Sequence, residues 1–320
     1  MTPIEFWMPA AGIFVLVLGL VVSRKALSAA KGEDWLLVLA GPFYAAPLAV
    51  FGAEHLNAAH DIMQGVPAWI PGRLFWAYFV GFALIAAGLS IAARKLVTLS
   101  SVLTAAMIFL FVLLIHLPDV VHDPSNRFLW TVALRDTAFA AGGMLLAVRQ
   151  SRIPGSGTWV WLLRLTIAIV VLDFGIEHFL HPEFAPGVPL QKITPSWVPV
   201  PRLWGYLVGA ILLATSAGMA FQRFARIAAL CNGVVMIVAT AALYLPILFM
   251  ARGTPAVVEG VNYVFDTLFI GATALLLAAA TPRWAEREAV SRASGPLRPA
   301  LRIVPSGGPH RIPQSDPEVQ

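Results

Sequence analysis

FGIEH at 174–178 and WVPVPRLWGYLVG at 197–209 each have a close copy earlier in the chain. The copies are FGAEH at 51–55 and WIPGRLFWAYFVG at 69–81. Each copy places a Glu-His pair at the end of an apolar segment, where an unpaired charge is costly. This repetition predicts a duplicated helical membrane protein with a polar cluster near one face.

Composition places the chain among integral membrane proteins. Of its 320 residues, 58% are hydrophobic and 12% are charged, and the mean hydropathy is +0.78. Soluble domains carry about twice that share of charged residues. The single cysteine, Cys231, excludes a disulfide framework or a cysteine-based metal site within one chain. The position of the charges matters more than the net charge of +5, and we expect no nucleic-acid partner.

Nine apolar segments approach the length of about 20 residues that crosses a bilayer. They are continuously apolar, without the alternation typical of strands, and therefore predict helices, which satisfy their own backbone hydrogen bonds in lipid. The predicted spans are 4–22, 35–56, 74–93, 97–117, 129–148, 159–180, 203–221, 227–250 and 257–280.

Further matches divide these helices into two units. LYLP at 243–246 matches IHLP at 115–118, and FDTLFIG at 265–271 matches RDTAFAAG at 135–142. Because four helices form each unit, both units should cross the membrane in the same direction, as parallel repeats do. The predicted domains are an N-terminal transmembrane helix (1–31), a first four-helix unit (32–150), a second four-helix unit (151–281) and a disordered cytoplasmic tail (282–320).

Basic residues indicate an orientation. Most arginines and lysines fall in alternate connections, beginning with the one that carries Arg24, Lys25 and Lys31, and in the tail. Cytoplasmic segments carry this excess in multi-pass proteins. We therefore expect a bacterial-type inner membrane protein with its N-terminus outside and its C-terminus in the cytoplasm.

Several ionisable residues fall within the predicted helices, in the outer part of the bilayer. Each costs about 2.5–3.5 kcal/mol on an insertion scale, so such a residue is expected to face the bundle and to have a partner. No catalytic residue can be assigned. The candidates for ligand binding or proton relay are Glu54, His55, Asp136, Asp173, Glu177, His178, His181, Trp197 and Asp266.

The two units differ in their charges. In the first unit Arg135 adjoins Asp136, whereas the second unit has a phenylalanine in the position of this arginine. The carboxylates Asp173, Glu177 and Asp266 are therefore predicted to share no buried arginine. Bound protons, a protonated histidine, an arginine folding in from a loop or a bound cation would have to compensate. On this ground we predict that the second unit carries the better site.

The same residues also have structural interpretations. The Glu-His pairs could hydrogen-bond helix ends and hold the loops. His178 and His181 have helical spacing beside Glu177 but lack a third fixed ligand, so we predict no metal site. His116 is interpreted as part of a solvated loop. The Pro- and Trp-rich loops are typical of interfacial anchors, and could also cover a pocket for a flat apolar ligand such as a quinone.

A family resemblance follows from the second copy. The run GIEHFLHPEFAPGVPLQKITPSWVPVPRLWGYLVG, followed by LYLPIL and an Asp-containing helix, resembles the DoxX-like family of small four-helix membrane proteins. The resemblance covers about 159–281 and, more loosely, about 36–148, as in a fused tandem pair. It implies a four-helix bundle per unit and, for some relatives, membrane redox work that includes thiosulfate-to-quinone electron transfer. The first copy departs from the pattern, with AAHDIMQG where the second has the HPEFAPG loop.

Three functions are compatible with this sequence, and enzymatic activity is left open. We favour an accessory or quinone-interacting subunit of a membrane redox system, with a quinone or a redox protein as partner. The alternatives are a small-molecule or ion carrier with Asp136 and Asp266 as its titrating pair, and a structural or assembly protein without a ligand. A pocket lined by Glu177, His178 and Trp197 would favour the first function. A path between the two units that reaches both aspartates would favour the second.

Overall fold

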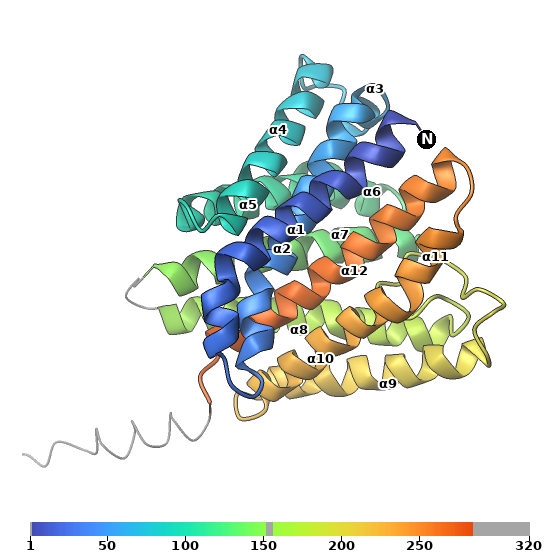
Figure 1. The fold of residues 1–320 in the computed structure, drawn as a ribbon. Coiled ribbons are helices and arrows are strands. Elements are labelled where there is room, and N and C mark those ends of the chain that lie inside the picture. The colour runs from blue at the N-terminus through green and yellow to red at the C-terminus, as the bar shows by residue number, and fades with distance from the viewer. Residues whose placement is uncertain (1, 152–155, 284–320) are drawn as a thin grey trace, which may run out of the picture. The chain divides into compact units, whose positions relative to one another are not determined.

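The computed structural model describes residues 2–151 and 156–283, and all but the first two residues of the predicted tail lie outside these ranges. Within the described residues, nine helical stretches are long and apolar enough to span a membrane, as the sequence predicts. The helices are drawn in Figure 1. They are α1 (Pro3–Ala29), α2 (Asp34–Asn57), α3 (Ala59–Ile62), η1 (Met63–Gly65), α4 (Arg73–Ala92), α5 (Val97–Phe111), η2 (Val112–His116), α6 (Leu117–His122), α7 (Arg127–Gln150), α8 (Ser156–Leu180), α9 (Pro201–Ala220), α10 (Ala225–Ala239), η3 (Thr240–Tyr244), α11 (Leu245–Met250) and α12 (Thr254–Ala280).

Two of the spans contain a π-helical turn. α5 continues through η2 into α6, and α10 continues through η3 into α11. Each π segment ends just before a Leu-Pro pair, with the prolines at Pro118 and Pro246. Proline lacks an N–H and crowds the carbonyl four residues earlier, and in both spans that carbonyl lies in the wider π turn. The last two residues of each π segment are the first two residues of the matched sequences IHLP (115–118) and LYLP (243–246).

Helices from both predicted units meet at the centre of the bundle. α12, α7 and α2 are the most buried spans, and α12 contacts α2, α7, α8 and α10 (Figure 1). The outer helices expose large apolar side chains, for example Phe14, Phe82, Leu103, Ile169 and Val238. Apolar side chains on the outside of helices are suited to lipid rather than water. The chain is therefore a multi-pass membrane protein.

The repeated motifs form the same local structure. Trp76 Nε1 donates to the carbonyl of Pro71, and Trp204 Nε1 donates to the carbonyl of Pro199, each at 3.1 Å. The residue that caps the start of α4 and the one that caps α9 both have left-handed backbone angles, with φ of 67° and 48°. The motif copies thus share their geometry. The tandem duplication and the common direction of the two units stay predictions.

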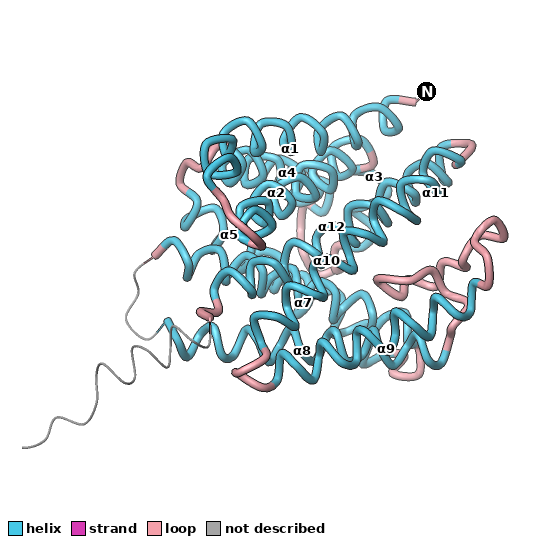
Figure 2. The backbone as a smooth tube through the Cα atoms, turned by 60° about the horizontal axis from the view of Figure 1, so that its bottom comes forward, coloured by secondary structure: helices cyan, strands magenta, loops and turns pink. Residues whose placement is uncertain are grey.

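The long loop between α8 and α9 folds back against α12 (Figure 2). Tyr263 donates to the carbonyl of Leu190 at 3.2 Å, and Tyr244 donates to the carbonyl of Ala185 at 3.2 Å. Most of the loop residues between these contacts are buried. The first half of the loop is therefore packed against the bundle, and it brings Leu190 to the site described next.

Candidate functional site

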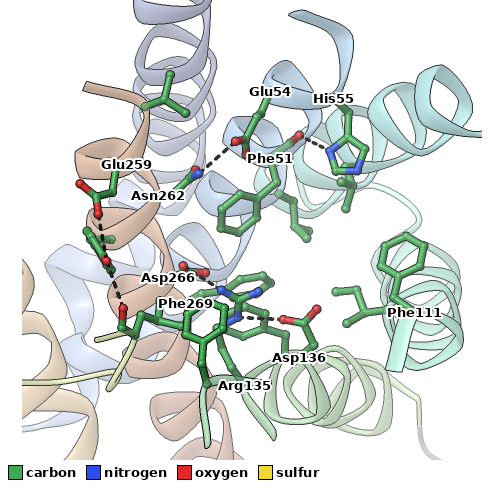
Figure 3. A pocket seen from close by; sticks show the side chains of 18 of the residues that line it. Phe51, Glu54, His55, Phe111, Arg135, Asp136, Glu259, Asn262, Asp266 and Phe269 are labelled. Atoms are coloured by element: carbon green, nitrogen blue, oxygen red, sulfur yellow. Dashed lines mark hydrogen bonds and ion pairs between the residues drawn. The ribbon is translucent and has the colours of Figure 1, made fainter. Parts of the chain in front are cut away.

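A cavity of about 490 Å³ lies between α2, α4, α5, α7 and α12 (Figure 3). Its walls are mostly aromatic and aliphatic, and its polar groups come from three helices. The apolar lining consists of Leu48, Phe51, Leu84, Ile108, Phe111, Phe128, Phe139, Leu190, Pro255, Val258, Tyr263 and Phe269. The polar lining consists of Glu54, His55, Arg135, Asp136, Glu259, Asn262 and Asp266.

Arg135 joins the two aspartates of the cavity. Its Nε donates to Asp136 Oδ1 at 2.9 Å, and its Nη1 donates to Asp266 Oδ2 at 3.1 Å (Figure 3). The prediction that Asp266 lacks a buried arginine is therefore wrong. The reason is that α12 packs against α7, so an arginine of the first predicted unit reaches an aspartate of the second.

A histidine completes this cluster. His116 Nε2 lies 2.9 Å from Asp136 Oδ2, and its side chain is only 19% exposed. The interpretation of His116 as a solvated loop residue is therefore wrong. The π segment η2 ends at His116, inside the span, and contacts α7.

The cavity contains more acids than fixed cations. Asp136 and Asp266 are almost completely buried, and Glu54 accepts a hydrogen bond from Asn262 at 3.0 Å. Arg135 is the one arginine in the cavity lining. Buried carboxylates need protons, hydrogen-bond donors or cations to compensate their charge. A ligand that donates hydrogen bonds or carries protons therefore suits this end of the cavity.

The two repeated histidines, His55 and His178, use Nδ1 in the same way but differ in the contacts of Nε2. Nδ1 of His55 contacts the carbonyl of Phe51 at 2.7 Å, and Nδ1 of His178 contacts that of Phe174 at 2.8 Å. A carbonyl only accepts, so both Nδ1 atoms carry hydrogen. His178 Nε2 then accepts from the backbone N–H of Gly187 at 3.2 Å, which fixes the α8–α9 loop. His55 has no second hydrogen bond within the described residues, and it lines the cavity.

Glu177 has an arginine partner that is only half-buried, a compensation of the kind that the sequence left open, although the arginine is Arg127 and not Arg202. Arg127, the first residue of α7, contacts Glu177 Oε1 through both Nε and Nη2. The carboxylate is 4% exposed, whereas the arginine side chain is 46% exposed. α7 lies against α8, so an arginine that the sequence places in an outer connection turns back onto the helix. The charge argument for a better site in the second unit therefore fails.

The remaining candidates lie away from the cavity. His181 Nδ1 is 3.5 Å from Glu183 Oε1, and the side chain of Trp197 is largely exposed. Asp173 is half-buried, and its Oδ2 has no hydrogen-bond partner within the described residues. The cavity lining therefore includes four of the nine predicted residues, Glu54, His55, Asp136 and Asp266, and leaves out Asp173, Glu177, His178, His181 and Trp197.

Aromatic packing closes one side of the cavity. The rings of Phe139 and Phe269 stack with centroids 4.0 Å apart, and Tyr44 meets Phe269 edge-on at 4.5 Å. Tyr44 is fully buried and donates to the carbonyl of Phe139 at 2.7 Å. Leu48, one turn after Tyr44 on α2, lines the cavity. The aromatic group of Tyr44, Phe139 and Phe269 therefore lies directly behind the cavity wall.

Glu259, Asn262 and Tyr263 line the cavity but are not among the predicted site residues. With Asp266 and Phe269 they recur at steps of three or four residues, which places them on one face of α12. That spacing is visible in the sequence and could have identified a polar stripe on the helix.

The described residues contain no group of three or more His, Cys, Asp or Glu side chains that could hold a metal ion.

Residues 159–245 match the family model described as DoxX. This segment is DoxX-like, as the sequence motifs predict. It runs from α8 to the start of α11, and of the residues that line the cavity it contains Leu190 alone. No curated protein and no solved structure matches the chain. The match to DoxX thus identifies a membrane-protein family but says nothing of what the cavity binds.

Proposed function

We propose that this membrane protein binds the ring of a lipid-soluble quinone in the cavity and exchanges protons with it. One observation carries the proposal: phenylalanine walls and an arginine-bridged pair of carboxylates occur in one cavity. Ligand sites typically have volumes of about 300–1,000 Å³ and apolar walls with a few convergent polar groups. The volume and lining of this cavity fit that description.

The polar groups match both redox forms of such a ligand. A quinone presents two carbonyl oxygens, which accept hydrogen bonds from groups such as the guanidinium of Arg135 or the amide of Asn262. A quinol presents two hydroxyl groups, which donate to carboxylates such as Asp266 and Glu54. The rings of Phe51 and the other phenylalanines supply flat apolar contact for the ring faces.

In this proposal the chain serves as an accessory subunit of a membrane redox system. Reduction of a quinone to a quinol consumes two electrons and two protons. A redox partner protein would supply the electrons, whereas the carboxylates of the cavity and His116 would bind and pass the protons. With the predicted orientation, these protons would come from the outer side of an inner membrane.

Binding can be tested on the purified full-length chain. Organic extracts are analysed for quinones by mass spectrometry, and short-chain ubiquinone and menaquinone analogues are titrated while thermal stability is followed. Asp266→Asn should weaken quinol binding roughly ten-fold or more, because a charge-assisted hydrogen bond contributes about 1.5–3 kcal/mol. Asp119→Asn, an exposed aspartate outside the cavity, is the matched control.

The proposal fails if wild-type protein carries no quinone and shows no saturable stabilisation by either analogue. It also fails if Asp266→Asn binds the quinol as well as Asp119→Asn does. A folded protein without any ligand would instead support a structural or assembly role.

A carrier function is the second candidate. Helices of both predicted units wall the cavity, and Arg135 ties Asp136 to Asp266 across them, as a site between two halves requires. The packing of Tyr44, Phe139 and Phe269 behind the cavity favours a closed binding site over a path. Proton-coupled or ion flux into proteoliposomes, abolished by Asp136→Asn, would place the carrier first.

A further inference from the structure

A second cavity, of about 310 Å³, lies at the opposite end of α2 and α7. The first cavity uses α2 from Leu48 to His55, whereas the second uses it from Leu37 to Pro42. Along α7, which contributes polar lining to both cavities, Asp136 and Arg149 are roughly 20 Å apart at 1.5 Å per residue. The lining of the second cavity consists of Ser23, Ala26, Leu37, Val38, Gly41, Pro42, Ile91, Ala92, Arg94, Val97, Leu146, Arg149 and Gln150.

Two exposed arginines at the mouth of this cavity have no ion-pair partner among the described residues. The side chains of Arg94 and Arg149 make no hydrogen bond or ion pair with the described residues, and the charges of Arg94 and Arg226 both act on Arg149. Glu33 and Asp34 belong to the same end of the bundle but contact Arg226, at 3.3 and 3.6 Å. The lining of the cavity contains no acidic residue. Within the part of the chain that the structure describes, the cavity thus presents two positive charges and no acidic side chain.

The backbone adds to this preference for an anion. Val97, the first residue of α5, lines the cavity, and the N–H groups of a first helical turn lack partners within their helix. Arg94 lies in the preceding turn with a left-handed φ of 57°, a conformation that favours glycine. The chain therefore carries a charged side chain at a position where the backbone alone would favour a smaller residue.

We propose that this cavity binds the phosphate group of an anionic phospholipid. Guanidinium groups bind phosphate oxygens through paired charge-assisted hydrogen bonds, and Arg94 and Arg149 offer two such groups. The remaining walls, among them Leu37, Ile91 and Leu146, are apolar and belong to membrane spans. A ligand with a phosphate head and an apolar body satisfies both parts of the cavity. Free phosphate would contact the arginines but would leave the apolar walls without a partner.

The site is tested on the full-length chain in a neutral detergent by native mass spectrometry. Phosphatidylglycerol and phosphatidylcholine with identical acyl chains are titrated, and inorganic phosphate is titrated separately. Basic residues near a membrane surface contribute roughly five-fold each to the binding of anionic lipids, so Arg94→Gln/Arg149→Gln should bind phosphatidylglycerol roughly 25-fold more weakly. Arg94→Lys/Arg149→Lys should bind with an affinity between those of the wild type and the double glutamine variant, because the charge is retained but the paired hydrogen bonds of the guanidinium groups are lost.

Arg223→Gln is the control for the loss of a single charge, because it removes one positive charge from the same end of the bundle but does not line the cavity. Preferential binding of phosphatidylglycerol that only the double glutamine variant loses would support the site. Equal binding of both lipids, or an equal loss in Arg223→Gln, would overturn it. Saturable inorganic phosphate binding without a lipid preference would overturn a lipid as the ligand. Thermal melts of all variants exclude unfolding as the cause of a loss.

Discussion

Replacement of Arg135 by glutamine is the most direct test of the charge arrangement in the first cavity. Arg135 lies 2.9 Å from Asp136 and 3.1 Å from Asp266, and the two aspartates are 8% and 3% exposed. The substitution leaves both carboxylates buried without their shared cation. His116 stays beside Asp136, so Asp266 loses more.

The expected loss of stability follows from this burial. Removal of one partner from a buried ion pair costs about 3–5 kcal/mol, because the remaining charge is left without compensation. For large domains, 1 kcal/mol corresponds to about 2–4 °C in melting temperature. Arg135→Gln should therefore melt roughly 6–20 °C below the wild type. Adding Asp266→Asn removes the stranded charge and should recover at least about 3 °C.

The melting temperatures are measured on detergent-purified protein by intrinsic fluorescence, for the wild type, both single variants and the double variant. Arg202→Gln is the control, since this exposed arginine makes no side-chain hydrogen bond or ion pair with the described residues. Surface changes of this kind stay within about 0.5 kcal/mol. A melting temperature of Arg135→Gln within about 1 °C of the control would refute the reasoning. A double variant as unstable as the sum of both singles would do the same.

Two other contacts can be tested in the same melting assay. Arg127→Gln should destabilise the protein less than Arg135→Gln, because Arg127 is about half exposed, and adding Glu177→Gln should restore part of the loss. No recovery would show that the pair does not carry the effect. Gly205→Ala would push a methyl group against a backbone carbonyl of the α8–α9 loop and should cost about 1–3 kcal/mol. Gly157→Ala, in open space, should be neutral or stabilising, and equal melting of both glycine variants would contradict the close contact.

The spans can be predicted from the sequence because each is a continuous apolar run of the length that a bilayer demands. The second predicted span, 35–56, differs by one residue at each end from α2 (Asp34–Asn57). The π segments were not predicted, because a single wider turn leaves the apolar pattern unbroken. Only the prolines that follow them mark these positions.

The site is only half predictable, because its residues come together through packing between distant helices. Glu54, His55, Asp136 and Asp266 stand out in the sequence as ionisable residues in apolar surroundings, and all four line the cavity. The contact between Arg135 and Asp266 spans 131 positions, and no local pattern indicates it. The contact between Arg127 and Glu177 was missed for the same reason.

The π turn that ends at His116 sets the direction in which the His116 side chain points. One residue more than an α-helix would use over this stretch rotates everything beyond it by about 100° around the helix axis. The imidazole that meets Asp136 sits at the end of that turn. Winding the same residues as a regular α-helix would turn this ring more than a quarter of a revolution away from α7, whereas deletion of Leu113 would remove the extra residue and leave the ring close to its present direction. The additional residue therefore fixes the rotation of one side chain about the helix axis, while the axis of the helix stays in place.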